Sequence, residues 1–186
     1  MSARLLEKYR KEVIPQMQDK YKIKNPMAVP HLDKVVVNMG VGEAISDVKI
    51  LDRAAQDLAT ITGQKALIRR AKKAISNFKL RENLPVGCKV TLRRGRMYEF
   101  VDRLVNISLP RIRDFNGTSR KAFDREGNYT LGITDQGIFP EIDISVRDHR
   151  IQGMDITFVF KNGNKEQNFE ILRLLGMPFT KEPSKS

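Results

Sequence analysis

The basic side chains of residues 65–96 are the groups whose type and spacing most clearly indicate a chemical role. This stretch holds eleven Lys and Arg residues and one acid, Glu82, so it carries +10 of the chain's formal net charge of +12. Soluble surfaces normally mix both signs of charge, whereas gathered cations neutralise the phosphates of a nucleic-acid backbone and release their counterions. The stretch therefore predicts a phosphate-binding surface whose affinity falls as salt rises. Its basic residues are Lys65, Arg69, Arg70, Lys72, Lys73, Lys79, Arg81, Lys89, Arg93, Arg94 and Arg96.

The opposite charge prevails later in the chain. Residues 131–160 hold five acids and only two bases, Arg147 and Arg150. Two interpretations stay open: this segment meets a basic protein, or it is a soluble sheet edge with scattered carboxylates. The acids are Asp135, Glu141, Asp143, Asp148 and Asp155.

No set of residues in the sequence has the spacing of a catalytic or metal site. His31 and His149 are the only histidines, and a single cysteine, Cys88, cannot build a cysteine-rich zinc site. A nucleophile, a base and a group that orients the base are not found together. We therefore expect a protein that is not an enzyme and that uses no cofactor and no metal.

Gly40-Val41-Gly42 follows a predicted strand and matches part of a dinucleotide-binding fingerprint. The match is incomplete, because Ile45 stands where a third glycine is needed and Glu43 would put a negative charge near a pyrophosphate. We interpret the segment as a turn in which glycine allows another backbone to come close.

The composition limits the class of protein to which the chain can belong. Forty per cent hydrophobic residues can form one compact core, and a single cysteine excludes an intrachain disulfide. No apolar run approaches the roughly 18 residues that a membrane helix needs, and the charged N-terminal sequence does not resemble a secretory signal. We expect a soluble, cytoplasmic protein without a membrane partner, although basic chains also bind acidic membranes and acidic proteins.

Periodicity predicts the elements that position these charges. Apolar residues at helical spacing predict helices over 3–20, 47–62 and 97–109, and Asn164 with Gln167 forms a capping pair before a last helix that ends at Gly176. Strands are predicted over 32–39, 66–70, 86–92, 129–133 and 154–160. Adjacent strands without a helix between them predict an α+β fold, with an antiparallel or mixed sheet and helices mainly on one face. We expect one domain over residues 1–179 and a flexible polar tail over 180–186.

Residues 71–85 are predicted to form a long basic hairpin loop between two of these strands. Ile75 and Leu80 interrupt its charges and are expected to hold the loop to its own body. Phe78 could pack in the same way, or it could stack on a base or ribose.

Seven ordered stretches carry a more specific signal: 37–44 (VNMGVGEA), 62–65 (TGQK), 78–82 (FKLRE), 85–93 (PVGCKVTLR), 110–115 (PRIRDF), 127–129 (GNY) and 138–142 (IFPEI). Together they resemble the bacterial form of large-subunit ribosomal protein five, over residues 3–178. The resemblance implies an α+β fold whose members bind 5S rRNA and help to form the central protuberance of the large subunit. It also implies contact with P-site tRNA through the basic loop, and a bridge to a basic protein of the small-subunit head.

The resemblance assigns residues to each of these roles. The partners expected are 5S rRNA, large-subunit rRNA, P-site tRNA, neighbouring large-subunit ribosomal proteins and that basic small-subunit protein. For 5S rRNA the residues are Lys34, Asn38, Met39, Gly40, Gly42, Gln64, Lys65, Arg69, Thr91 and Arg93. For tRNA they are Lys72, Lys73, Ser76, Asn77, Phe78, Lys79 and Arg81, and for the bridge they are Glu141, Asp143 and Asp148.

Two departures from the family pattern are visible. Asn83 stands where many relatives have glycine, and Asn tolerates the left-handed backbone that such a position requires. Residues 144–149 are less acidic than expected, which affects the exact bridge contacts but not the RNA-binding role.

Two further hypotheses belong to other classes. The chain could be a general RNA chaperone or regulator that acts away from the ribosome. It could also be an adaptor for a membrane surface or an acidic partner, with the amphipathic helix over 3–20 as its contact.

Overall fold

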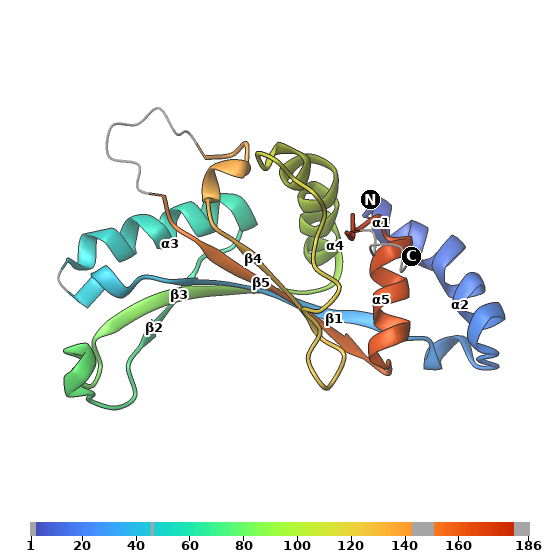
Figure 1. Ribbon diagram of the computed structural model, residues 1–186, viewed down its shortest axis with the longest axis horizontal. Helices are drawn as coiled ribbons and strands as arrows, with labels where there is room; N and C mark the ends of the chain where they lie inside the picture. Colours follow the sequence, from blue (N-terminus) through green and yellow to red (C-terminus); the bar gives the residue numbers. More distant parts are fainter. Residues whose placement is uncertain (1–2, 46, 143–150, 181–186) are drawn as a thin grey trace, which may run out of the picture. The chain divides into compact units, whose positions relative to one another are not determined.

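A five-stranded antiparallel sheet with the strand order β2-β3-β1-β5-β4 organises the protein (Figure 1). The computed structural model describes residues 3–45, 47–142 and 151–180. All five predicted strands are present, and the predicted α+β class is confirmed. The strands are β1 (His31–Gly40), β2 (Leu67–Arg70), β3 (Pro85–Leu92), β4 (Tyr129–Ile133) and β5 (Met154–Lys161).

The helices also form where apolar spacing predicted them. They are α1 (Arg4–Lys8), α2 (Ile14–Tyr21), α3 (Val48–Thr62), α4 (Arg94–Arg103) and α5 (Lys165–Leu174). The Asn164–Gln167 capping box is present at the start of α5, and the chain leaves this helix through Gly176 at φ +102°.

Proline explains the one systematic difference from the predicted helices. The predicted helices over 3–20 and 97–109 each contain a π-helical turn, Tyr9–Val13 and Leu104–Ser108. Each turn ends two residues before a proline, Pro15 or Pro110. Proline lacks an N–H and its ring crowds the carbonyl four residues earlier, so the wider turn takes up the misfit.

The chain forms two compact units, which we describe separately. The first consists of the described residues of Met1–Val35, Leu92–Leu131 and Thr157–Ser186, and the second of those of Val36–Thr91 and Gly132–Ile156. The expectation of one domain over residues 1–179 therefore stays a prediction. The expected tail lies outside the described residues except for Thr180.

An aromatic cluster and the paired helices hold the first unit together. Phe123 and Tyr129 lie 4.7 Å apart between ring centroids, and Phe169 and Phe179 lie 4.6 Å apart, so the ring before β4 and the ring after α5 join one core. The Tyr9 hydroxyl donates a hydrogen bond to the Pro30 carbonyl (2.8 Å), which ties the N-terminal helix to the start of β1.

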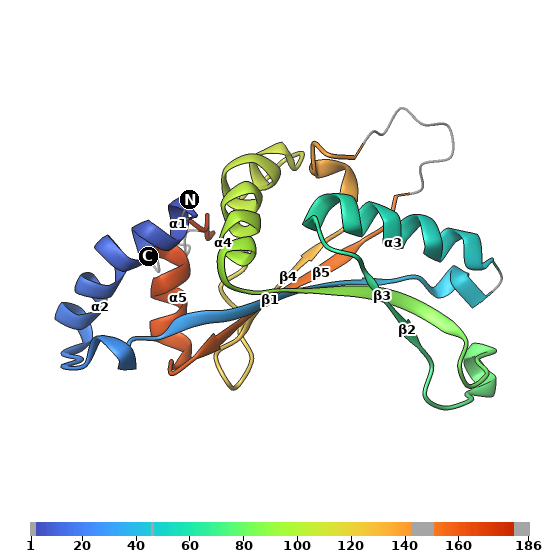
Figure 2. The same ribbon diagram turned by 180° about the vertical axis from the view of Figure 1, so that it is seen from behind.

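Helix α3 covers one face of the strands in the second unit (Figure 1, Figure 2). Leu51, Leu58 and Ile61 are fully buried along one side of the helix. The Asp47 side chain accepts a hydrogen bond from the Lys49 amide at the start, and Gly63 ends the helix at φ +67°, directly after the predicted range of 47–62. One face of these strands therefore forms the core, and the other stays uncovered by this helix.

Backbone crowding at Gly87 gives a stability prediction. A Cβ atom on Gly87 would lie 2.6 Å from the Met39 carbonyl oxygen, whereas a Cβ on Gly40 meets nothing within 4 Å. Gly87→Ala should therefore lower the free energy of unfolding by about 1–3 kcal/mol, and Gly40→Ala should change it by less than about 0.5 kcal/mol. Urea unfolding followed by circular dichroism measures both, and equal effects would contradict the close approach of β1 and β3.

Candidate nucleic-acid interface

The strands of the second unit present an uncovered face, which we call the open face. Burial alternates over residues 35–40 of β1 and 88–92 of β3, so side chains that flank a buried residue there point away from α3. Val37 and Met39 are buried in β1, and Cys88 and Val90 are buried in β3. The open face consists of Val36, Asn38, Gly40, Leu67, Arg69, Lys89 and Thr91.

The pairing of β2 with β3 brings cations onto this face. Leu67 pairs with Lys89 and Arg69 pairs with Gly87, and directly paired residues share a face of the sheet. Gly87 has no side chain, so the Arg69 side chain meets no neighbour across the strand pair. Lys89 joins the site in this way; the sequence placed it in the phosphate-binding stretch, but the family resemblance did not assign it to 5S rRNA. What places Lys89 on the open face is the pairing register of β2 and β3, and the sequence alone does not determine that register.

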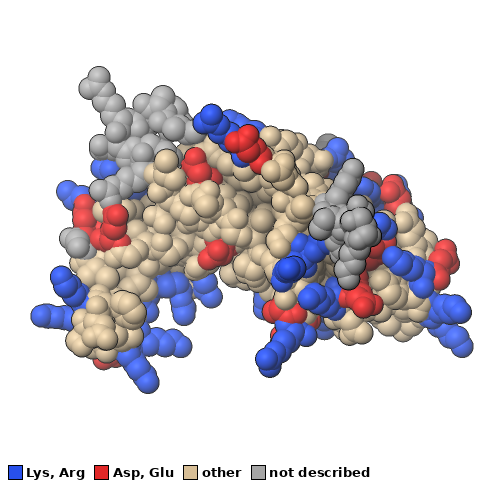
Figure 3. Space-filling view, viewed as in Figure 1, with Lys and Arg blue, Asp and Glu red and all other residues tan. Residues whose placement is uncertain are grey.

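Uncharged polar groups stand beside these cations. Asn38 and Gly40 are exposed and Thr91 is half-buried, so the structure brings these three predicted residues onto one face. The Gln64 side-chain amide donates to the Thr91 carbonyl (3.4 Å) and so lies against β3. Lys65 follows directly and is exposed. In the space-filling view, Lys and Arg side chains gather on the side of this unit that faces away from α3 (Figure 3).

Four predicted residues have side chains or positions outside the open face. The Met39 side chain is fully buried on the opposite side of β1, so only its backbone is available to a ligand. Lys34 and Arg93 belong to the first unit, where Arg93 donates to both carboxylate oxygens of Asp33 (3.1 and 3.2 Å) and the Lys34 ammonium lies 3.9 Å from one of them. Gly42 is exposed and begins a short 3₁₀ turn.

Residues 71–84, the β2–β3 connection, have hydrogen bonds of their own. Ala71 donates to Leu84, and Asn83 donates to Ala71. Further along, Ile75 and Leu80 exchange a reciprocal pair of backbone hydrogen bonds at 3.0 Å, so the backbone of the connection closes on itself here. The Ile75 side chain is 44% exposed, so the expectation that these two side chains hold the loop to its own body stays a prediction. Asn83 adopts φ +66°, the left-handed backbone expected where relatives have glycine.

The tip of the connection presents its side chains to solvent. Ser76, Asn77 and Phe78 form a 3₁₀ turn, and Lys79 ends it at φ +53°. Phe78 is 67% exposed, so its ring is accessible to a partner. The other residues predicted to contact tRNA, Lys72, Lys73, Lys79 and Arg81, are exposed as well.

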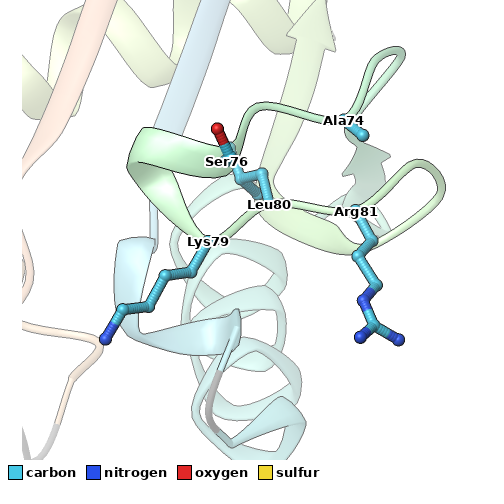
Figure 4. A pocket seen from close by; sticks show the side chains of 5 residues that line it. All are labelled: Ala74, Ser76, Lys79, Leu80 and Arg81. Atoms are coloured by element: carbon cyan, nitrogen blue, oxygen red, sulfur yellow. The ribbon is translucent and has the colours of Figure 1, made fainter.

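An open hollow of about 530 Å³ lies at this tip, lined by Ala74, Ser76, Lys79, Leu80 and Arg81 (Figure 4). Lys79 and Arg81 point away from each other, so they do not converge on one small anion. Cations that diverge in this way suit an extended chain of phosphates better than a single small molecule.

The predicted bridge residues are only partly visible. Glu141 is half-buried, and Asp143 and Asp148 lie outside the described residues. The segment before them is fixed to α3, because the Gln136 side-chain amide donates to the Asp57 carboxylate (3.0 Å). Ile138 is buried beside this contact.

Groups that could support catalysis are not assembled in the part of the chain that the structure describes. Burial raises the pKa of the Cys88 thiol to about 11, so little reactive thiolate exists at neutral pH. Within residues 3–45, 47–142 and 151–180, no cluster of His, Cys, Asp and Glu could hold a metal ion, and no helix is long and apolar enough to cross a membrane.

These features define a basic α+β protein with a surface suited to RNA. Two family models match the chain: ribosomal protein L5 over residues 25–81 and the ribosomal L5P family C-terminus over residues 85–179. The chain is 56% identical to large ribosomal subunit protein uL5 of Clostridium kluyveri, over 98% of this chain and 100% of the relative. It is 55% identical to the Clostridium botulinum protein (97% and 100%) and 54% identical to the Clostridium acetobutylicum protein (96% and 99%), both also uL5.

The chain belongs to the ribosomal protein L5 family. It is a structural protein of the large ribosomal subunit, and so a cytoplasmic protein, as predicted. Its relatives are ribosomal proteins and not enzymes, which agrees with the missing catalytic spacing in the sequence.

Two neighbouring residues of β1 test the assignment of the open face. Met39→Ala removes a fully buried side chain and should lower the free energy of unfolding by about 2–5 kcal/mol. Asn38→Ala alters an exposed side chain and should change it by less than about 0.5 kcal/mol. Urea unfolding of both variants decides the point, since comparable losses would mean that Asn38 is not a surface residue.

Proposed function

We propose that this protein binds 5S rRNA through the open face of its second unit and thereby helps to form the central protuberance. The observation that carries the proposal is the combination of uncharged polar groups, Asn38 and Thr91, with the cations Arg69 and Lys89 on one uncovered sheet face. Cations supply affinity for any phosphate backbone, while amide and hydroxyl groups can bind ribose 2′-hydroxyls and base edges.

The shape of the face supports an RNA helix as the ligand. A-form RNA presents a wide, shallow minor groove, which a flat surface can meet and a protruding helix does not need to enter. Gly40 is exposed and a Cβ there would meet nothing within 4 Å, so a sugar-phosphate chain can come close to the backbone at this point of the face. The large-subunit rRNA and neighbouring ribosomal proteins are further partners that we expect from the family.

Alanine variants of the polar pair test the proposal. Asn38→Ala and Thr91→Ala should each weaken binding of 5S rRNA by roughly 1 kcal/mol, about fivefold, because each loses a hydrogen bond to the RNA. Thr60→Ala is the matched control, since Thr60 lies on α3 and its hydroxyl donates to the Gln56 carbonyl. Gel-shift titration at moderate salt measures the affinities. A 5S rRNA affinity unchanged in both variants would overturn the role of the open face.

We further propose that the β2–β3 connection contacts P-site tRNA. The support is a tip with four exposed cations and an exposed ring, Phe78, which could stack on a base or ribose. The internal hydrogen bonds of the connection lower the entropy that must be lost on contact.

A double variant separates the two surfaces. Lys72→Ala with Lys73→Ala should leave 5S rRNA binding within about twofold and should weaken retention of P-site tRNA on assembled ribosomes, because only phosphate contacts at the tip are lost. Lys161→Ala with Lys165→Ala removes the same charge from exposed positions in the first unit and should leave tRNA retention unchanged. Filter binding of labelled tRNA measures retention. Collapse of 5S rRNA binding in the tip variant would show that the two surfaces are not separate.

The bridge to a basic protein of the small-subunit head remains part of the proposal. Its support is the surplus of acids in residues 131–160 and the fixed segment that ends in Glu141. The alternative role, an RNA chaperone away from the ribosome, predicts that the protein stays at the top of a sucrose gradient. A subunit component sediments with large subunits.

A further inference from the structure

The methionines of this chain differ sharply in their access to solvent. Six of the seven lie within residues 3–45, 47–142 and 151–180, and Met27 is the one exposed methionine among them, at 81%. The thioether of methionine is a group that oxidants convert to a sulfoxide. Exposure therefore separates Met27 from the five buried methionines, whose exposed fractions are 0–4%: Met17, Met39, Met97, Met154 and Met177.

The backbone at Met27 is held in place although its side chain is exposed. Met27 lies in the 3₁₀ turn Pro26–Ala28, which connects α2 to β1 in the first unit. Its N–H donates to Oδ1 of Asn25 (2.9 Å), and its carbonyl accepts from the Asn162 side-chain amide (3.5 Å). Both hydrogen bonds use the backbone, so a chemical change at the sulfur atom leaves them intact.

The single thiol of the chain does not compete for an oxidant. Cys88 is 0% exposed, and burial raises the pKa of its thiol to about 11. Cysteine oxidation proceeds through the thiolate, of which little exists at neutral pH. Cys88 therefore reacts only after β3 opens, whereas Met27 is accessible in the folded protein.

We propose that Met27 is the preferred site of reversible oxidation by peroxides in the free protein. The sulfur atom of Met27 attacks one oxygen of the peroxide, the S–O bond forms and the O–O bond breaks. The proton on the attached oxygen passes to the departing hydroxide, which leaves as water when the oxidant is hydrogen peroxide. Sulfur loses two electrons and the peroxide gains them, so the products are methionine sulfoxide and water.

The position of Met27 decides what the modification does to the fold. A sulfoxide is polar, so the same reaction at a buried methionine would place a polar group in the core and disrupt it. At Met27 the new S=O group lies in water, where it forms hydrogen bonds with solvent. The sulfoxide is also accessible to the reductases that reverse this reaction. The oxidised protein therefore stays folded and can be repaired.

Limited treatment of the full-length protein with hydrogen peroxide, followed by peptide mapping, tests the proposal. Cleavage after Lys and Arg puts each methionine in a peptide of its own, including Met1, which lies outside the described residues. The peptide with Met27 should gain one oxygen atom at least about tenfold faster than those of the five buried methionines, because these react only when the fold opens. The rate should hardly change with pH near neutrality, since a thioether has no proton to lose.

Two variants and a repair step complete the test. Met27→Leu should abolish the fast uptake of oxygen, whereas Met177→Leu, a change of similar volume at a buried position, should leave it intact. Oxidised wild-type protein should keep its circular-dichroism spectrum and its urea midpoint, and methionine sulfoxide reductases should restore its original mass. In denaturant the six methionines should react at similar rates, because the protection by the fold is then lost.

Three results would overturn the proposal. The first is a native protein in which a buried methionine or Cys88 gains oxygen as fast as Met27. The second is fast uptake that survives in Met27→Leu. The third is a shift of the urea midpoint when Met27 alone is oxidised, because the side chain would then contribute to the core.

Discussion

Repulsion between like charges is the constraint that most limits how this chain can fold. A net charge of +10 within residues 65–96 cannot be buried, and it destabilises any compact arrangement that brings the cations together. The fold places most of these residues along the edge strand β2, its connection to β3 and the open face, and Arg93, Arg94 and Arg96 at the start of α4. Water and salt screen them at these positions. In the same stretch, Cys88 and Val90, which flank Lys89 in β3, are buried and make the core contacts. RNA phosphates would relieve the remaining repulsion, which is why the charge and the proposed function belong together.

The same constraint shapes the β2–β3 connection. A dense run of one sign would be expected to leave the segment without order, yet reciprocal hydrogen bonds between Ile75 and Leu80 close a small hairpin within it. The backbones of Ile75 and Leu80 thus order the connection, and the Lys and Arg side chains around them are exposed. Gly87 has a related role: because it lacks a Cβ atom, the Met39 carbonyl of β1 can lie close to the backbone of β3.

Much of the fold followed from local signals in the sequence. Gly176 and the Asn164–Gln167 pair marked helix ends because each depends on its own backbone conformation or on neighbours three residues away. Periodicity could not show the π-helical turns, since a single extra residue per turn hardly alters the apolar pattern. The candidate interface was less predictable, because it depends on register. Register puts Lys89 on the open face and Met39 beneath it, and only pairing between strands distant in the sequence decides this.

Binding of 5S rRNA and of an unrelated RNA duplex, compared across a salt series, tests the central claim most directly. Phosphate contacts should make both affinities fall as salt rises. If Asn38 and Thr91 bind features specific to 5S rRNA, the affinity for 5S rRNA should exceed the affinity for the duplex at every salt concentration. Binding of 5S rRNA should also persist at salt concentrations where the duplex no longer binds measurably. Two coincident curves would contradict the account, because the open face would then recognise charge alone.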